Sequence, residues 1–93
     1  MLVFEWDEEK AITNKRKHGV TFEEAITVFQ DPHSITIFDP DHSTDEDRFI
    51  DLGYSNKERL LVVIYTERNN KIRIISCRPA TRSERRSYEQ NNL

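Results

Sequence analysis

The longest apolar run in the chain, Leu60–Tyr65, limits what the sequence can fold into. It is far shorter than the ~18 consecutive apolar residues of a membrane-spanning helix, so we expect no membrane partner. The wider segment Arg59–Glu67 is apolar on both faces at its middle, which is typical of a central strand buried on both sides. We therefore predict a sheet with this segment inside it.

Three other segments have strand-like patterns: Ser34–Phe38, Arg48–Tyr54 and Lys71–Arg78. In Arg48–Tyr54, apolar and polar residues alternate with the period of a strand. Asn69-Asn70 suits a two-residue turn, because asparagine tolerates positive φ. The short connections favour antiparallel pairing of all four segments. A fifth, short strand at 4–6 is an option.

Helix signals stand on both sides of these segments. Asp7 is a good N-cap for a helix that ends at Gly19, and Thr21 opens a second helix with Glu24 in a capping box. A second capping box, Thr81 to Glu84, opens a final helix that runs to about residue 91. We predict an α+β fold in which a helical hairpin and a C-terminal helix pack on a four-stranded, or five-stranded, antiparallel sheet.

The length of 93 residues and the composition favour one globular domain, residues 1–93. A single cysteine excludes an internal disulfide and favours a reducing compartment, so we expect a cytoplasmic protein. The first ten residues include four acids and no long apolar run, so we expect no secretory signal. The net charge is −3, but residues 1–58 carry 6 basic and 14 acidic residues, whereas residues 59–93 carry 8 basic and 3 acidic. An anion would therefore be attracted to the last third of the chain.

The strongest candidate site is a set of arginines in that last third. Arg82, Arg85 and Arg86 share one helix face by their spacing, and Arg78 precedes the helix by a short turn. Helix N-termini and guanidinium groups both favour phosphate. The alternative for the helix arginines is a solvated face on which Glu89 pairs with one of them.

The hairpin of the last two strands supplies a second set of candidates. A two-residue turn places Thr66 opposite Arg73 and puts Glu67 on the other face, as a general base or merely a surface acid. Arg73 and Arg78 are an odd number of residues apart, so they share a face only if a bulge or the strand end turns Arg78 around.

The end of the first helix is basic. Lys15, Lys17 and His18 suit the negative end of the helix dipole, which alone could explain them. A histidine can also move a proton near neutral pH.

The acidic segment Asp39–Asp47 fails as the start of a calcium loop, because in a twelve-residue loop counted from Asp39 the sixth residue is Thr44, where glycine is required, and the twelfth is Ile50, where glutamate is required. It is more typical of a solvated loop or of a patch for a basic partner. A Gly-rich phosphate loop and a Cys/His metal cluster are absent from the sequence, so we expect metal-independent chemistry and no cofactor.

Motifs along nearly the whole chain resemble the BrnT toxin family. The resemblance lies in Phe4-Glu5-Trp6-Asp7, Lys17-His18-Gly19-Val20-Thr21-Phe22-Glu23-Glu24-Ala25, Asp39-Pro40-Asp41-His42-Ser43, Arg48-Phe49, Leu52-Gly53, Tyr65-Thr66-Glu67-Arg68, Ile72-Arg73-Ile74-Ile75-Ser76, Ala80-Thr81, Glu84-Arg85 and Tyr88-Glu89. The chain departs from the family pattern at Pro79, where the family usually has arginine or lysine.

The resemblance implies a RelE-like fold, with helices on one face of an antiparallel sheet and RNA on the exposed surface. It implies a bacterial type II toxin that cleaves RNA and halts translation. It also implies a ribbon-helix-helix antitoxin that forms a heterotetramer with the toxin and binds operator DNA.

We predict acid–base cleavage of RNA through attack by the 2′-hydroxyl. The residues expected to take part are Arg78 and Arg82 for charge stabilisation, Glu67 or His18 as base, Tyr88 or Lys15 to position or protonate, and Lys17, Arg73 and Arg85 along the RNA backbone. The rival interpretation is a non-catalytic module that binds RNA or protein. A DNA-binding regulator fits less well, because the second helix begins with acidic residues.

Overall fold

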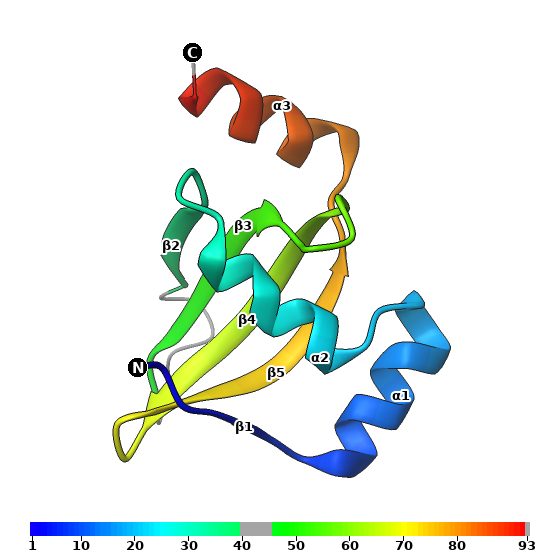
Figure 1. Ribbon diagram of the computed structural model, residues 1–93, viewed down its shortest axis with the longest axis vertical. Helices are drawn as coiled ribbons and strands as arrows, with labels where there is room; N and C mark the ends of the chain where they lie inside the picture. The colour runs from blue at the N-terminus through cyan, green and yellow to red at the C-terminus, as the bar shows by residue number, and fades with distance from the viewer. Residues whose placement is uncertain (40–45, 93) are drawn as a thin grey trace.

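The chain folds around one five-stranded sheet, shown in Figure 1. The computed structural model describes residues 1–39 and 46–92. The elements in chain order are β1 (Phe4–Trp6), α1 (Glu8–His18), α2 (Phe22–Ala25), the 3-10 helix η1 (Ile26–Gln30), β2 (Ile35–Asp39), β3 (Arg48–Tyr54), β4 (Leu60–Arg68), β5 (Lys71–Pro79) and α3 (Arg82–Asn91).

The predicted α+β fold is confirmed, with β4 inside a sheet of order β1-β5-β4-β3-β2. Every pairing among β2, β3, β4 and β5 is antiparallel, as expected from their short connections. The short strand β1 does form, but it pairs parallel to β5, so the sheet is mixed. None of the described helices is long and apolar enough to span a membrane.

The two faces of the sheet are covered by different helices. On the covered face, Leu61 and Val63 of β4 pack with Val20 and Phe22 from the hairpin of α1 and α2. We call the other side, which carries the even-numbered residues of β4, the second face. There Val62 packs with neighbouring apolar residues and with Tyr88 of α3. The C-terminal helix therefore closes only one end of the second face, and it does not join the other helices on the covered face.

The local helix signals fold as predicted at three of the four caps. Asp7 caps α1, Gly19 ends it with a φ of 70°, and Thr81 and Glu84 form the complete capping box of α3. At α2, Thr21 accepts the Glu24 N–H, but the Glu24 side chain does not return to the cap, so that half of the predicted box is wrong. The second helix is also shorter than predicted, because it continues as the 3-10 helix η1.

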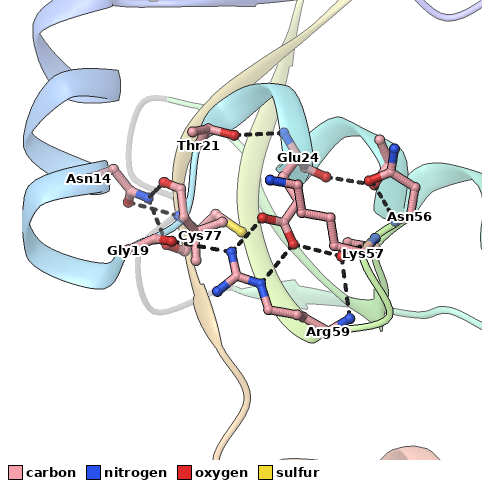
Figure 2. Close-up of polar contacts among 11 residues, drawn as sticks. Asn14, Gly19, Thr21, Glu24, Asn56, Lys57, Arg59 and Cys77 are labelled. Atoms are coloured by element: carbon pink, nitrogen blue, oxygen red, sulfur yellow. Dashed lines mark hydrogen bonds and ion pairs between the residues drawn. The ribbon is translucent and has the colours of Figure 1, made fainter.

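The Glu24 side chain is instead bound inside the protein, as Figure 2 shows. Its carboxylate accepts a 2.7 Å hydrogen bond from Ser55 and forms a two-point ion pair with Arg59, which also donates to the carbonyl of Gly19. A buried carboxylate needs such a cation more than a helix N-terminus needs a return contact.

One side chain attaches α1 to the outer edge of β5. The buried amide of Asn14 donates to the carbonyls of Cys77 and Val20, at 2.8 and 3.0 Å, and accepts the Cys77 N–H at 3.0 Å. The Asn14 side chain thus replaces a neighbouring strand where β1 no longer pairs. This contact holds the basic end of α1 beside β5.

Candidate functional site

A bulge in β5 brings the two predicted strand arginines to the same face of the sheet. Ile64 pairs with Ser76 and the next residue of β4, Tyr65, pairs with Ile74, so Ile75 is the extra residue of the bulge. Arg78, which follows the bulge, pairs with Val62, and Arg73, which precedes it, pairs with Thr66. Both therefore point to the second face, about 13 Å apart along the strand at 3.3 Å per residue.

Arg78 lies at the α3 end of the second face and is bound to Glu84. Its Nη1 and Nη2 donate to the two carboxylate oxygens of Glu84, each at 2.8 Å, and Nη1 also reaches the carbonyl of Pro79 at 3.3 Å. The hydrogen bond from Arg78 holds the pKa of Glu84 down to about 2. The Arg78 side chain keeps 37% of its surface exposed, so it is paired but accessible.

Arg73 lies toward the other end of the second face. Its Nη1 donates to Glu5 of β1 at 2.8 Å, and its side chain is 28% exposed. Lys71 approaches the same carboxylate at 3.9 Å. Arg68, which pairs with Lys71 across the hairpin, forms a two-point ion pair with Glu46. The acidic segment predicted at 39–47 is otherwise mostly outside the described residues, at 40–45.

The predicted residues of α3 fall into three different settings. Arg85 donates to the Tyr54 hydroxyl at 3.0 Å and borders the second face. Arg82 is exposed at the start of the helix and has no side-chain partner within residues 1–39 and 46–92. Tyr88 is buried and donates to Asp31 at 2.7 Å, and burial together with that carboxylate raises its pKa to about 12. Tyr88 therefore attaches α3 to the domain.

The basic end of α1 reaches the site from the edge of β5. A shallow groove of about 410 Å³ runs between α1 and the edge of β5. Ile75 and Ser76 line it from β5, and Lys17 and His18 line its end near the C-terminus of α1. The rest of its lining comes from Asp7, Glu9, Lys10, Thr13 and Asn14. Ser76 shares the second face with Arg78, since its partner Ile64 lies two residues from Val62 on β4. The groove thus opens beside the strand segment that separates the two arginines.

Two other predicted residues lie elsewhere. Glu67 is exposed near the hairpin turn, and the alternation of β4 directs it to the covered face, opposite Ile72. Lys15 lines a different groove, of about 620 Å³, between α1 and α2. Neither residue is brought together with Arg78.

Sequence reasoning missed the roles of Glu84, Ser76 and Glu5. Glu84 was predicted only as a helix cap, although its position six residues after Arg78, across the junction from β5 to α3, was a usable signal. Within the described ranges, no three histidine, cysteine, aspartate or glutamate side chains gather closely enough to hold a metal ion.

Comparison with known proteins identifies the family. Residues 6–84 match the family described as "Ribonuclease toxin, BrnT, of type II toxin-antitoxin system". The chain belongs to the BrnT family. It is therefore a ribonuclease toxin of a type II toxin-antitoxin system, with RNA as substrate and an antitoxin as partner.

Structural comparison agrees with this assignment at the level of the BrnT fold. The crystal structure of the Brucella abortus ribonuclease toxin BrnT superimposes with a TM-score of 0.64 at 24% identity, over 88% of this chain and all of the other. A comparison with curated proteins gave no match.

Proposed function

We propose that this chain is an endoribonuclease that cuts RNA without a metal ion and thereby inhibits translation. The observation that carries the proposal is the bulge at Ile75, because it puts Arg73 and Arg78 in one row on the second face. The groove with Lys17 and His18 opens beside that row. A row of accessible guanidinium groups suits a phosphate backbone, and proton-transfer groups beside it suit cleavage.

In the proposed reaction, a base removes the proton of the 2′-hydroxyl, and the 2′-oxygen forms a bond to the adjacent phosphorus. The bond from phosphorus to the 5′-oxygen breaks, and that oxygen takes a proton. The products are a 2′,3′-cyclic phosphate and a 5′-hydroxyl. Base and acid each contribute about 10²–10⁴-fold, and fixed cations stabilise the charge that develops on the phosphate oxygens.

His18 is the better supported of the two predicted bases, because it lines the groove at Ser76, whereas Glu67 lies toward the other face. Lys17 lines the same groove, and we assign it the proton for the leaving oxygen. Arg78 stabilises the reacting phosphate. Arg73 contacts the RNA backbone on one side of it.

Arg82 and Arg85 extend the backbone contacts onto α3. Both lie in its first turns, where amide groups and guanidinium groups together favour phosphate. The two earlier candidates for proton transfer, Tyr88 and Lys15, have no part in the proposed reaction, since one is bound to Asp31 and the other lines a separate groove.

The biological setting of the proposal follows from the family. A type II system implies an antitoxin, and we propose a ribbon-helix-helix antitoxin that forms a heterotetramer with this toxin in the cytoplasm. Operator DNA would be bound through the antitoxin. Co-expression with the neighbouring open reading frame, followed by light scattering of the purified complex, measures the stoichiometry.

The cleavage proposal is tested with purified protein, end-labelled RNA and EDTA. We expect fragments with 2′,3′-cyclic phosphate ends, and a loss of about 10²-fold or more for His18→Ala and Arg78→Ala. Arg16→Ala is the matched control, because its exposed side chain lines the separate groove between α1 and α2. Binding of RNA without fragments would favour a non-catalytic module, and dependence on added metal would overturn the proposed chemistry.

A further inference from the structure

Three arginines in the described chain form two-point ion pairs with glutamate, and one differs from the others in geometry. Arg59 and Arg68 each use Nε and Nη2, the side edge of the guanidinium group. Arg78 uses Nη1 and Nη2, the end of the group. The end-on pair leaves the side edge of Arg78 available.

The remaining donors of Arg78 can be counted. A guanidinium group has five N–H bonds. One from each terminal nitrogen goes to Glu84, and Nη1 also donates to Pro79. The Nε–H and the second Nη2–H, which are adjacent and parallel, have no partner among the described residues. No buried side-chain nitrogen or oxygen in residues 1–39 and 46–92 lacks a partner, so the Nε–H reaches solvent.

Glu84 itself is held in place by the start of α3. Its Oε1 accepts the Thr81 N–H at 2.8 Å, while its own N–H donates to the Thr81 hydroxyl at 3.2 Å. The Thr81 N–H, which any residue other than proline at that position keeps, therefore holds Oε1 of Glu84, and the two carboxylate oxygens orient Arg78 in turn. Because Arg78 stands on β5, the contact connects the end of that strand to the first turn of α3.

We propose that Glu84 is a positioning residue, which fixes the Arg78 guanidinium group so that its Nε–Nη2 edge binds one RNA phosphate through two parallel hydrogen bonds. This inference rests on the proposed function and adds to it the orientation of the phosphate contact. An arginine binds phosphate best through two donors at once, and a fixed donor pair loses little entropy on binding.

The proposal predicts that Glu84→Gln lowers turnover but does not lower the affinity for RNA. Glutamine offers one acceptor oxygen, and its NH₂ group faces the second Arg78 donor, so the guanidinium group loses its fixed orientation. Turnover should fall at least about tenfold, since a displacement of about 1 Å can cost 10²-fold. Affinity for RNA should stay equal or rise, because one negative charge leaves the site.

The experiment measures kcat and KM for the wild type, Glu84→Gln and Thr81→Ala. Thr81→Ala is the matched control, because it removes a cap contact of α3 but leaves both Arg78–Glu84 hydrogen bonds. A lower kcat with unchanged or lower KM in Glu84→Gln, but not in Thr81→Ala, supports the proposal. Faster cleavage by Glu84→Gln would show that Glu84 competes with the RNA phosphate for Arg78. An equal loss of kcat in both variants would show that Glu84 has a purely structural role. Either result overturns the proposal.

A second measurement does not depend on cleavage. The arginine side-chain NMR signal of the Arg78 Nε–H, assigned by its loss in Arg78→Lys, is followed during titration with a 2′-O-methyl RNA, which cannot be cut. We expect a sharp signal that shifts on binding in the wild type and a broadened, unresponsive signal in Glu84→Gln. A shift without any ribonuclease activity would overturn the proposed function but keep this inference, whereas cleavage without a shift would overturn the inference alone.

Discussion

The amide of Asn14 gives the sharpest test of how this fold is assembled. Its side chain makes three hydrogen bonds to backbone groups, two with Cys77 and one with Val20, in a buried position. Replacement by alanine leaves one N–H and two carbonyls without these partners at the edge of β5. The same change removes the contact that holds the basic end of α1 beside the arginine row.

The magnitude follows from those three groups. An unsatisfied buried backbone group costs about 1–3 kcal/mol, and water entering from the edge reduces the cost, so we expect a loss on the order of 3 kcal/mol. This is a large part of the roughly 5–15 kcal/mol that stabilises a typical domain. For a chain of this length it corresponds to a fall in Tm of about 12–24 °C.

Urea denaturation of Asn14→Ala beside Thr13→Ala measures the effect. Thr13 is the neighbouring exposed residue of the same helix, and its replacement should change the free energy of unfolding by less than about 0.5 kcal/mol. If Asn14→Ala unfolds within about 1 kcal/mol of this control, the amide does not replace a strand at the edge of β5, and the inferred anchoring of α1 is wrong.

Asn14→Asp adds a pH dependence with a defined sign. The introduced carboxyl would face the carbonyls of Val20 and Cys77, so its pKa in the folded protein should rise above the unfolded value. The folding stability of Asn14→Asp is then greatest below the unfolded-state pKa, near 4, and is lost as the pH rises through the pKa of the folded state. The difference from the wild type in urea midpoint should therefore be larger at pH 7 than at pH 4.

Three further changes test single contacts. The hydrogen bond from Arg78 holds the pKa of Glu84 at about 2 instead of 4.5, so the pair stabilises the fold above pH 4.5 and this stabilisation is lost toward pH 2. The urea midpoints of the wild type and Glu84→Gln should therefore converge on acidification. Gly53→Ala puts a Cβ 2.9 Å from Val28 Cγ1, and thermal unfolding should show a loss of about 1–3 kcal/mol. Asn70→Ala at a φ of 64° should cost about 1 kcal/mol by the same measurement, and Asn70→Gly should not.

Local chemistry made the strands and their turn predictable from the sequence. Asn69 and Asn70 both adopt positive φ, at 53° and 64°, as a two-residue turn requires. That turn sets the pairing of Thr66 with Arg73, which was predicted and is confirmed. The central position of β4 was equally predictable, because it depends only on which side chains are apolar.

The bulge and the edge contacts were not predictable in the same way. No glycine or proline marks Ile75, and an extra residue in a strand costs little where the neighbouring strand has ended. The parallel pairing of β1 and the Asn14 contact both join segments more than 60 residues apart. Such pairings depend on the assembled sheet, so local patterns contain no signal for them.

The two Thr-x-x-Glu capping boxes show how far local sequence patterns can predict side-chain contacts. The Glu84 side chain accepts the N–H of its cap residue Thr81 and also binds Arg78, whereas the Glu24 side chain binds Arg59 and makes no contact back to its cap residue. Glu24 is only 3% exposed, and at that depth a carboxylate is stable only beside a cation and further donors. Its arginine stands 35 residues away, beyond local reasoning, but Arg78 is six residues from Glu84. A basic residue at the end of a strand, followed by a capping glutamate in the next helix, is therefore a pattern that can be tested on sequence alone, and here it would have singled out the arginine on which the proposed chemistry depends.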